Sequence, residues 1–375
     1  MSGRIPAEVF PPGEFIREEL EARAWTQTDL AEILGRPLKA ISEILTGKRA
    51  ITPETAHGLG EAFGTGPQLW MNLESTYRLS LARKEGGDVA RRAKLYESAP
   101  VKDMIKRQWI DQPENTDDLE RELTRFFGPK ADTRAAARMS AEYVETWTSS
   151  QLAWLCRAQH LARSLSVGRF DEKYLDQALA GLPQLTSSEQ EARRVPRMLA
   201  DVGIRFLVIE HLPKTRIDGA ALWLDGQLPV VVVSLRYDRI DGFWHTLAHE
   251  LAHIKYRDGQ EDKGWQLDEN LIGEGASRKE DKTECERRAD EFACNFIVPR
   301  EEIDSFVARV RPYYSKQQII RFANRIRVHP GLIVGQLQHR GEIKYSQCRE
   351  MLVKIRDKVT ESALTDGWGS LPQSV

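Results

Sequence analysis

Apolar and polar positions change their spacing along the chain, and this change divides it into regions. Residues 14–80 carry short apolar faces at helical spacing, separated by turns marked by glycine and threonine. Residues 85–195 are helical in pattern and rich in charge, with polar breaks at IDQPENTDD and FFGPKADT. From about residue 200, the runs IRFLVIE, AALWL and PVVVVSL predict strands, and Asp225-Gly226 predicts a hairpin turn between the last two.

The last third of the chain predicts further helices. A helix over about 241–257 follows the strands, and a polar, acid-rich segment covers 258–283. The stretch ECERRADEFACNFIVP predicts another helix that stops near Pro299, and the final TDGWGSLPQSV is expected to form a loose tail. We therefore expect four regions, whose limits are 1–82, 83–194 (a helical linker), 195–345 and 346–375 (a C-terminal helix and tail).

Length and composition set limits on the class of protein. The 375 residues are enough for two or three domains, each with its own core. No apolar run reaches the ~18 residues of a membrane helix, and the N-terminus lacks an apolar signal region, so a cytoplasmic location is expected. The four cysteines form no CxxC pair and predict reduced, structural thiols. A net charge of −2 means that nucleic-acid binding would need a local basic patch.

The N-terminal region has the pattern of a helix-turn-helix. Two short apolar faces flank Gly35, which supplies the tight turn between them. These faces are Leu30, Ala31 and Leu34 before the glycine, and Ile41, Ile44 and Leu45 after it. Thr52-Pro53 then starts a further helix, with a capping hydroxyl and a proline at the first helical position.

If the second apolar face points inward, polar residues on the same helix point outward. They are Lys39, Ser42 and Glu43, at the positions from which side chains are expected to contact bases in the DNA major groove. Contacts with the DNA backbone are expected from Gln27, Arg36 and Lys48. A helical bundle with an ordinary solvated face would show the same pattern, so the residues alone leave both interpretations open.

The stretch from FPPGEFIREEL to GTGPQLWMNLESTY resembles the HigA-like branch of Xre-type helix-turn-helix proteins, over about residues 10–80. The resemblance implies binding to operator DNA, usually as a homodimer, and a role as an antitoxin or autorepressor. It also implies that Lys39, Ser42 and Glu43 lie on the recognition helix and Gln27 on the phosphate side.

A candidate metal site lies in DGFWHTLAHELAHIKY. In HELAH, His249 and His253 are one helical turn apart, so both imidazoles project from one face toward a common ion. Glu250 lies beside that face and is placed to act as a general base on a water molecule. The opposite side carries the apolar residues Leu247, Leu251 and Ile254, which are expected to pack on the sheet.

Two histidines are too few for catalytic zinc, which takes three protein ligands. The best candidate for the third is Glu286, on the following helix. Ala289 is small enough to let that helix approach, and Asp290 could accept a hydrogen bond from a ligand imidazole. Glu284 and Glu291 are competing candidates on the residues alone.

Three stretches, IDGAALWLDGQLPVVVVSLRYDRIDGFWHTLAHELAHI, ERRADEFACNFIVP and FANRIRVHPGLIVGQLQHRGEI, resemble the ImmA/IrrE family of metallo-endopeptidases over about 195–345. The resemblance implies Zn²⁺ as the cofactor and Glu286 as the third ligand. The expected fold is therefore α+β, mostly α: an N-terminal helix-turn-helix bundle, a helical middle region and a zincin-like domain with a small mixed sheet.

Several roles around this site stay open. His245 lies one turn before His249, which suits either a substrate-facing or supporting role or simple packing. A donor for the developing oxyanion is needed, and the candidates are His245, Tyr237, His329 and His339. An edge strand within 229–235 is expected to bind an extended peptide by strand addition.

The two resemblances give two hypotheses of function. The first is a DNA-binding regulator with a zinc endopeptidase domain that cleaves a repressor or antitoxin protein in a stress, phage or mobile-element response. The second is a HigA-like repressor or antitoxin whose zincin-like domain senses a ligand or partner without turnover. Neither hypothesis involves a membrane. The middle helices carry no motif, and could connect the modules, dimerise or transmit a signal.

Overall fold

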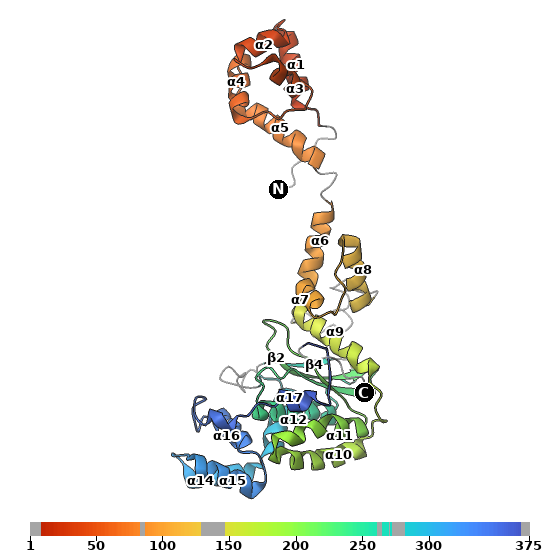
Figure 1. Cartoon of the computed structure of the whole chain (residues 1–375), viewed down its shortest axis with the longest axis vertical. Coiled ribbons are helices and arrows are strands. Elements are labelled where there is room, and N and C mark those ends of the chain that lie inside the picture. The colour runs from red at the N-terminus through yellow and green to blue at the C-terminus, as the bar shows by residue number, and fades with distance from the viewer. Residues whose placement is uncertain are drawn as a thin grey trace. The chain divides into compact units, whose positions relative to one another are not determined.

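The computed structural model describes residues 9–82, 87–128, 147–260, 265–269, 271 and 282–368. The chain divides into two compact units, residues 1–94 and 95–375, and Figure 1 shows the elements of each. In the described part of the chain, no helix has both the length and the apolar character that a bilayer span requires.

The first unit is the helical bundle that the apolar pattern predicts. Its helices are α1 (Pro12–Ala22), α2 (Gln27–Ile33), α3 (Leu38–Leu45), α4 (Pro53–Phe63) and α5 (Pro67–Ala82), followed by α6 (Gly87–Ser98) at the unit boundary. Gly35 has a φ of 59° between α2 and α3, a value that glycine adopts without strain. Thr52 accepts a hydrogen bond from the Thr55 amide and starts α4 ahead of Pro53, as predicted.

The core of this unit holds both apolar faces of the predicted helix-turn-helix. Leu30 is 0% exposed, Ile41 2% and Ile44 7%, and these side chains pack in one cluster with residues of the other helices. Thr26 forms a capping box with Asp29 at the start of α2, which fixes where that helix begins. The local sequence signals and the packing therefore agree throughout this unit.

The second unit contains a mixed sheet flanked by helices. The helices are α7 (Val101–Lys106), α8 (Thr116–Phe127), α9 (Ser149–Ser164), α10 (Glu172–Gly181), α11 (Val195–Asp201), α12 (Ile240–Tyr256), α13 (Glu284–Ile297), α14 (Arg300–Val310), α15 (Lys316–Ile326), α16 (Pro330–His339) and α17 (Arg356–Thr360). Short 3₁₀ helices are η2 (Leu182–Ser187), η3 (Glu189–Arg194) and η5 (Arg349–Met351). Within the described residues, the five strands run in the order β4-β2-β3-β1-β5. These strands are β1 (Arg205–Val208), β2 (Ile217–Leu224), β3 (Leu228–Val233), β4 (Trp265–Glu269) and β5 (Leu364–Thr365).

Strand pairing gives the small mixed sheet that was expected. β1 runs parallel to β3 and β5, whereas β2 runs antiparallel to β3 and β4. The predicted hairpin turn joins β2 to β3, with φ of 53° at Asp225 and 75° at Gly226. Positive φ at both positions suits the right-handed twist of the flanking strands, which is why the Asp-Gly pair marks this turn.

Each face of the sheet contributes to its own core. Ala221, Val231 and Val233 pack with α12, and the alternate residues of the same strands pack on the opposite side with α9. Figure 1 shows α9 on one side of the sheet and α11 and α12 on the other. The segment predicted as a helical linker contributes to both cores. Trp154 of α9 is 0% exposed in the core on the α9 side of the sheet, and Leu179 of α10 is 7% exposed in the core on the α12 side.

The expectation of an edge strand within 229–235 is wrong. Among the described strands, the one at 228–233 is central, between β2 and β1, and the edges are β4 and β5. β4, with the sequence WQLDE, lies in the acid-rich segment, where no strand was predicted. The expected loose tail is also wrong at its start, because Thr365 ends β5 and Asp366 is 5% exposed. Residues 369–375 of that predicted tail lie outside the described residues.

Candidate functional site

Helix α12 places the HELAH residues in the interior of the second unit. His249, Glu250 and His253 are each 0% exposed. The apolar residues on its other side, Leu247, Leu251 and Ile254, are at most 1% exposed and pack in the core that includes β2 and β3. The helix therefore has an apolar face in the core and a histidine face turned toward α13, which packs closely against it.

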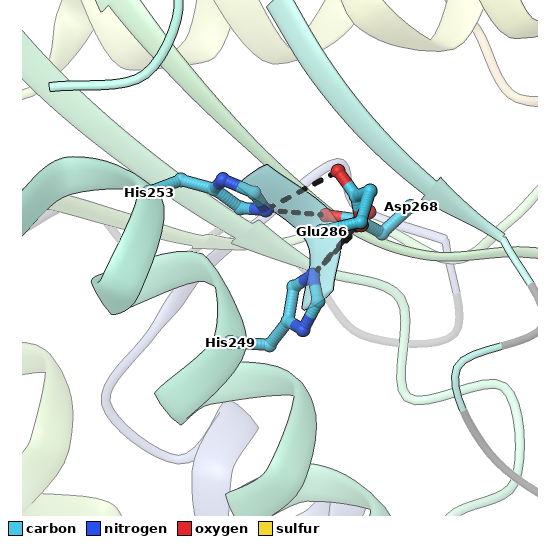
Figure 2. Close-up of side chains that lie close together, drawn as sticks. All are labelled: His249, His253, Asp268 and Glu286. Atoms are coloured by element: carbon cyan, nitrogen blue, oxygen red, sulfur yellow. Dashed lines mark hydrogen bonds and ion pairs between the residues drawn. The ribbon is translucent and has the colours of Figure 1, made fainter. Parts of the chain in front are cut away.

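Helix α13 brings Glu286 to the two histidines. The Glu286 carboxylate lies 3.2 Å from Nε2 of His249 and 3.6 Å from Nε2 of His253, as Figure 2 shows. Ala289, one turn further along α13, is 0% exposed, which is consistent with the close helix approach that its small side chain predicts. Glu284 and Glu291, the competing candidates, are exposed, and Glu291 forms an ion pair with Arg300 at 3.3 Å.

A second carboxylate, absent from the sequence-based prediction, joins this cluster. Asp268 on β4 is 3% exposed and lies 3.5 Å from Nε2 of His249 and 3.6 Å from Nε2 of His253. Asp268 pairs with Gly219 of β2, so its side chain is on the sheet face that meets α12. The alternation of apolar and polar residues in WQLDE was the available signal, and the neighbouring charges obscured it.

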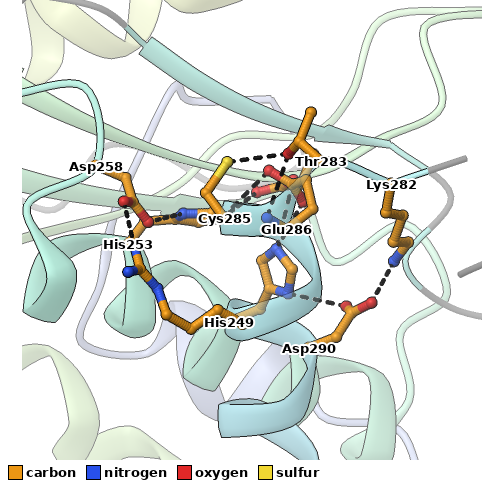
Figure 3. Close-up of polar contacts among 10 residues, drawn as sticks. His249, His253, Asp258, Lys282, Thr283, Cys285, Glu286 and Asp290 are labelled. Atoms are coloured by element: carbon orange, nitrogen blue, oxygen red, sulfur yellow. Dashed lines mark hydrogen bonds and ion pairs between the residues drawn. The ribbon is translucent and has the colours of Figure 1, made fainter.

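Each histidine has an acidic partner on its other ring nitrogen (Figure 3). Nδ1 of His249 lies 3.2 Å from Asp290, which in turn forms an ion pair with Lys282 at 2.6 Å. Nδ1 of His253 lies 2.9 Å from Asp258, which accepts a hydrogen bond from Arg288 at 2.6 Å. Such outer carboxylates orient imidazoles toward a metal. Asp290 lies where the sequence predicts it, whereas Asp258, just past the end of α12, was missed.

Glu250 lies beside the histidine cluster in a closely packed position. A Cβ atom at Gly219 would fall 2.2 Å from Oε1 of Glu250, so the backbone of β2 packs directly against the Glu250 carboxylate. Neither carboxylate oxygen of Glu250 has a hydrogen-bond partner among the described residues. Burial, and then the nearby Asp268 carboxylate, raise the pKa of Glu250 well above its usual value. Glu250 is thus a buried carboxylate without a hydrogen-bond partner among the described residues.

The donor set fits a divalent cation. Nε2 of His253 and Oδ2 of Asp268 are buried and have no hydrogen-bond partner in the described part of the chain. Buried polar atoms are rarely left in this state, because each unsatisfied group costs about 1–3 kcal/mol. Burial raises the pKa of Asp268, but the adjacent His249 and His253 lower it below its usual value, which keeps this carboxylate charged. Two imidazoles and carboxylate oxygens are the ligands that zinc takes in proteins.

A cavity of about 800 Å³ opens beside this cluster. His245 and Asp290 are in its wall, together with His339 of α16. Burial lowers the pKa of His245 to about 3, so its imidazole is neutral. The ring centroids of His245 and His339 are 6.3 Å apart. Two of the four oxyanion candidates therefore lie side by side in the wall of this cavity.

The other two oxyanion candidates have different surroundings. His329 caps the N-terminus of α16, where its Nδ1 accepts a hydrogen bond from the Gly331 amide. Tyr237 is 41% exposed and lies under the Arg236 guanidinium, 4.6 Å from it. Neither residue is in the wall of the large cavity.

In the first unit, the predicted DNA contacts lie on the surface around α3. The exposed residues among them are Gln27, Arg36, Lys39, Ser42 and Lys48. Glu43 is half-buried and lies 3.6 Å from Arg49, so this carboxylate already has a cationic neighbour. The buried side of α3, with Ile41 and Leu45, holds the helix against the bundle and leaves the polar side accessible.

Comparisons with known proteins assign both units. Residues 16–70 match the helix-turn-helix family, and residues 207–340 match the IrrE N-terminal-like domain of the M78 peptidases. An uncharacterized HTH-type transcriptional regulator of Escherichia coli, YddM, is 36% identical over 84 residues, which are 22% of this chain and 88% of that protein. Virulence-associated protein A' of Dichelobacter nodosus is 33% identical over 81 residues, covering 21% of this chain and 70% of that protein.

Among solved structures, an addiction module antidote protein of the HigA family from Coxiella burnetii is 38% identical. The match covers 21% of this chain and 86% of that one, with a TM-score of 0.20. The family match and the similarity to YddM show that the chain belongs to the helix-turn-helix family of DNA-binding regulators through its N-terminal unit. Its second unit carries an IrrE N-terminal-like domain.

Proposed function

We propose that the chain is a DNA-binding regulatory protein whose second unit is a zinc-dependent endopeptidase. The observation that carries this proposal is the convergence of His249, His253 and Glu286 next to Glu250, a buried carboxylate without a partner among the described residues. Two imidazoles and one carboxylate are the ligand set of a catalytic zinc site, and the glutamate beside them supplies the base.

The residues have separate roles in this proposal. His249, His253 and Glu286 hold the ion, and Asp290 and Asp258 orient the two imidazoles. A bound zinc ion would polarise the carbonyl of the peptide bond and lower the pKa of a water molecule. Glu250, buried beside the cluster, takes a proton from the attacking water and delivers it to the leaving amine.

The cavity beside the cluster is proposed to receive the peptide. Its wall combines apolar residues such as Phe292 and Leu332 with the polar groups of His245 and His339. Such a mixture suits a substrate side chain held beside the bond to be cleaved. The neutral His245 imidazole can donate one hydrogen bond, and we propose it as the first residue to test as oxyanion donor.

The substrate is proposed to be a regulator, either a transcriptional repressor or an antitoxin. A helix-turn-helix unit and a domain of a peptidase family in one chain support this proposal, because proteolysis by such a chain would occur close to operator DNA, where regulators of this class bind. On the DNA side, Lys39, Ser42 and Glu43 are proposed to read bases, and Gln27, Arg36 and Lys48 to contact phosphates.

One observation favours a second candidate function. Asp268 adds a fourth protein donor to the cluster, and zinc sites with four protein ligands are usually structural. In this alternative the chain is a repressor or antitoxin that senses a ligand or a partner through a metal site without turnover. The two candidate functions differ in one expectation: the peptidase cleaves another protein and needs Glu250 to do so, whereas the sensor cleaves none.

The test compares cells that carry the wild-type chain with cells that carry Glu250→Gln at equal levels. New protein N-termini are then measured across the proteome by mass spectrometry. A peptidase gives at least one cleavage in a DNA-binding regulator that is present with wild type and absent with Glu250→Gln. Identical N-terminal profiles under inducing stress would instead favour the sensor.

A further inference from the structure

Asp268 lies where a fourth ligand of the ion would be. Its two oxygens are 3.5 Å and 3.6 Å from Nε2 of His249 and His253, and the matching distances from Glu286 are 3.2 Å and 3.6 Å. Donor atoms about 2.0–2.2 Å from a tetrahedral ion lie about 3.3–3.6 Å from one another. The four histidine–carboxylate distances are close to this range, and one donor atom from each of the four side chains lies within 4.8 Å of the others.

We propose that Asp268 is a fourth protein ligand that closes the metal centre, and that a peptide reaches the ion only after strand β4 withdraws this carboxylate. This inference rests on the proposed function and adds a regulatory step to it. Catalytic zinc sites keep one position open for water or substrate, and four protein ligands leave none. The resting chain would then hold a complete set of catalytic residues in a closed state.

Strand β4 is suited to this role by its place at the edge of the sheet. Among the described strands it pairs with β2 alone, and the pairing is irregular between Ile217 and Gly219, next to Asp268. An edge strand with one partner breaks fewer backbone hydrogen bonds on release than a central strand, so its local opening costs less. The Asp268 side chain lies on the α12 face of this strand, so release of β4 would move it away from the histidines.

Two side-chain contacts hold the end of β4 in place. Nε2 of Gln151, on α9, donates a hydrogen bond to Glu269, and the Leu271 amide donates one to Asp218 at 2.8 Å. Asp218 is itself fixed by Arg236, at 2.9 Å and 3.1 Å. These contacts lie outside the ligand set, so they can be altered without touching a residue that binds the ion.

Gln151 offers a selective variant. Its side chain also completes a capping box with Thr148 at the start of α9. Glutamate serves equally well at this position of a capping box, so Gln151→Glu keeps the helix cap. The same change places a carboxylate against Glu269 and replaces a hydrogen bond by like-charge repulsion. It should loosen β4 while all four donor residues remain.

The experiment uses the full chain loaded with Co²⁺, whose visible absorption reports the number and type of ligands. Acetohydroxamate, a small metal-binding probe, is titrated into wild type, Asp268→Ala and Gln151→Glu. Asp176→Asn is the matched control, because Asp176 contacts α12 from outside, through Lys255 at 2.7 Å. Affinity for Co²⁺ is measured in parallel by competition with a chelator.

We expect wild type and Asp176→Asn to show the same four-coordinate spectrum and the same weak binding of acetohydroxamate. Asp268→Ala should change the spectrum, weaken Co²⁺ binding by about tenfold or more, and bind the probe more tightly. If less than about a tenth of the wild-type population is in the open state, a variant that opens freely binds the probe about tenfold more tightly. We expect this increase for Gln151→Glu.

The inference is overturned if both variants bind Co²⁺ and acetohydroxamate as wild type does. That outcome leaves a three-ligand site intact, so the proposed function survives it. If wild-type chain binds Co²⁺ and Zn²⁺ no better than Glu286→Gln does, the proposed metal site itself fails and the inference fails with it. Should Asp268→Ala be unfolded by circular dichroism, the Gln151→Glu result alone decides.

Discussion

Gly219 and Glu250 meet across the contact between β2 and α12, so closely that a Cβ atom at position 219 would lie 2.2 Å from Oε1 of Glu250. The same glycine pairs with Asp268 on β4. Gly219 therefore determines how much space the Glu250 carboxylate, the proposed base, has. Any larger side chain at position 219 would collide with that carboxylate.

The first prediction follows from this contact. Gly219→Ala should displace the Glu250 carboxylate and lower cleavage of the identified substrate by about 100-fold or more, because a misplaced general base loses most of its contribution. Zinc content should stay at the wild-type level, since no ligand changes. Cleavage within a factor of about two of wild type would show that the base lies elsewhere.

A second prediction concerns Asp258, which contacts Nδ1 of His253 at 2.9 Å. Asp258→Ala should weaken zinc binding by about 10–100-fold, because the imidazole loses the partner that orients it. Chelator competition measures this affinity, and Asp176→Asn again serves as the control on the outer side of α12. Equal affinities of Asp258→Ala and wild type would remove Asp258 from the metal centre.

The third prediction concerns stability. Arg107 is 8% exposed and bonds to the Glu210 and His211 carbonyls at 2.6 Å and 2.7 Å, and lies 3.4 Å from Asp366. Arg107→Ala removes the arginine that pairs with the buried Asp366 and should lower the free energy of unfolding of the second unit by about 3–5 kcal/mol.

Urea denaturation followed by tryptophan fluorescence measures this loss. Arg125→Ala removes an arginine whose pairs with Asp111 and Glu122 are more exposed, and should cost less than about 1 kcal/mol. Equal losses from the two variants would mean that the junction between α7 and the C-terminal strand does not stabilise the fold.

A fourth prediction separates base reading from phosphate contact. Lys39→Ala should weaken binding to a fragment of the chain's own promoter by about 1–3 kcal/mol, and should relax the sequence preference. Lys48→Ala should weaken binding to all sequences alike and reduce the slope of log K against log salt by about 1. Gln68→Ala, on exposed α5, is the control. Unchanged binding of Lys39→Ala at every salt concentration contradicts the placement of the recognition helix.

Local sequence signals predict much of the fold. The capping residue Thr52, the turn at Gly35 and the Asp225-Gly226 hairpin act within a few residues, so each can be predicted from its neighbours. The HELAH residues and Glu286 follow from helical spacing together with a family resemblance. The cap, the turn and the hairpin depend on local geometry alone, whereas the choice of Glu286 over Glu284 and Glu291 depends on the resemblance.

The residues that were missed depend on tertiary contacts. Asp268 reaches the histidines only because β4 pairs with β2 in a register that faces it toward α12. Asp258 turns back to His253 because Arg257, the residue that follows the last residue of α12, has a left-handed backbone with φ of 58°. β5 is two residues long and gains its order from pairing with β1 and from the buried Asp366. Of these contacts, only that of β4 leaves a periodic trace in the sequence, the short alternation in WQLDE, and the neighbouring charges obscure it.

The most direct test of the central claim is the zinc content of the purified chain, measured by mass spectrometry after dialysis against a weak chelator. Wild type and Glu250→Gln should each retain one zinc ion per chain, because Glu250 acts as a base and holds no ion. Glu286→Gln should lose most of its zinc, since an amide replaces a ligand carboxylate. If Glu286→Gln retains zinc as wild type does, or if wild type retains none, the metal centre proposed for His249, His253 and Glu286 is contradicted.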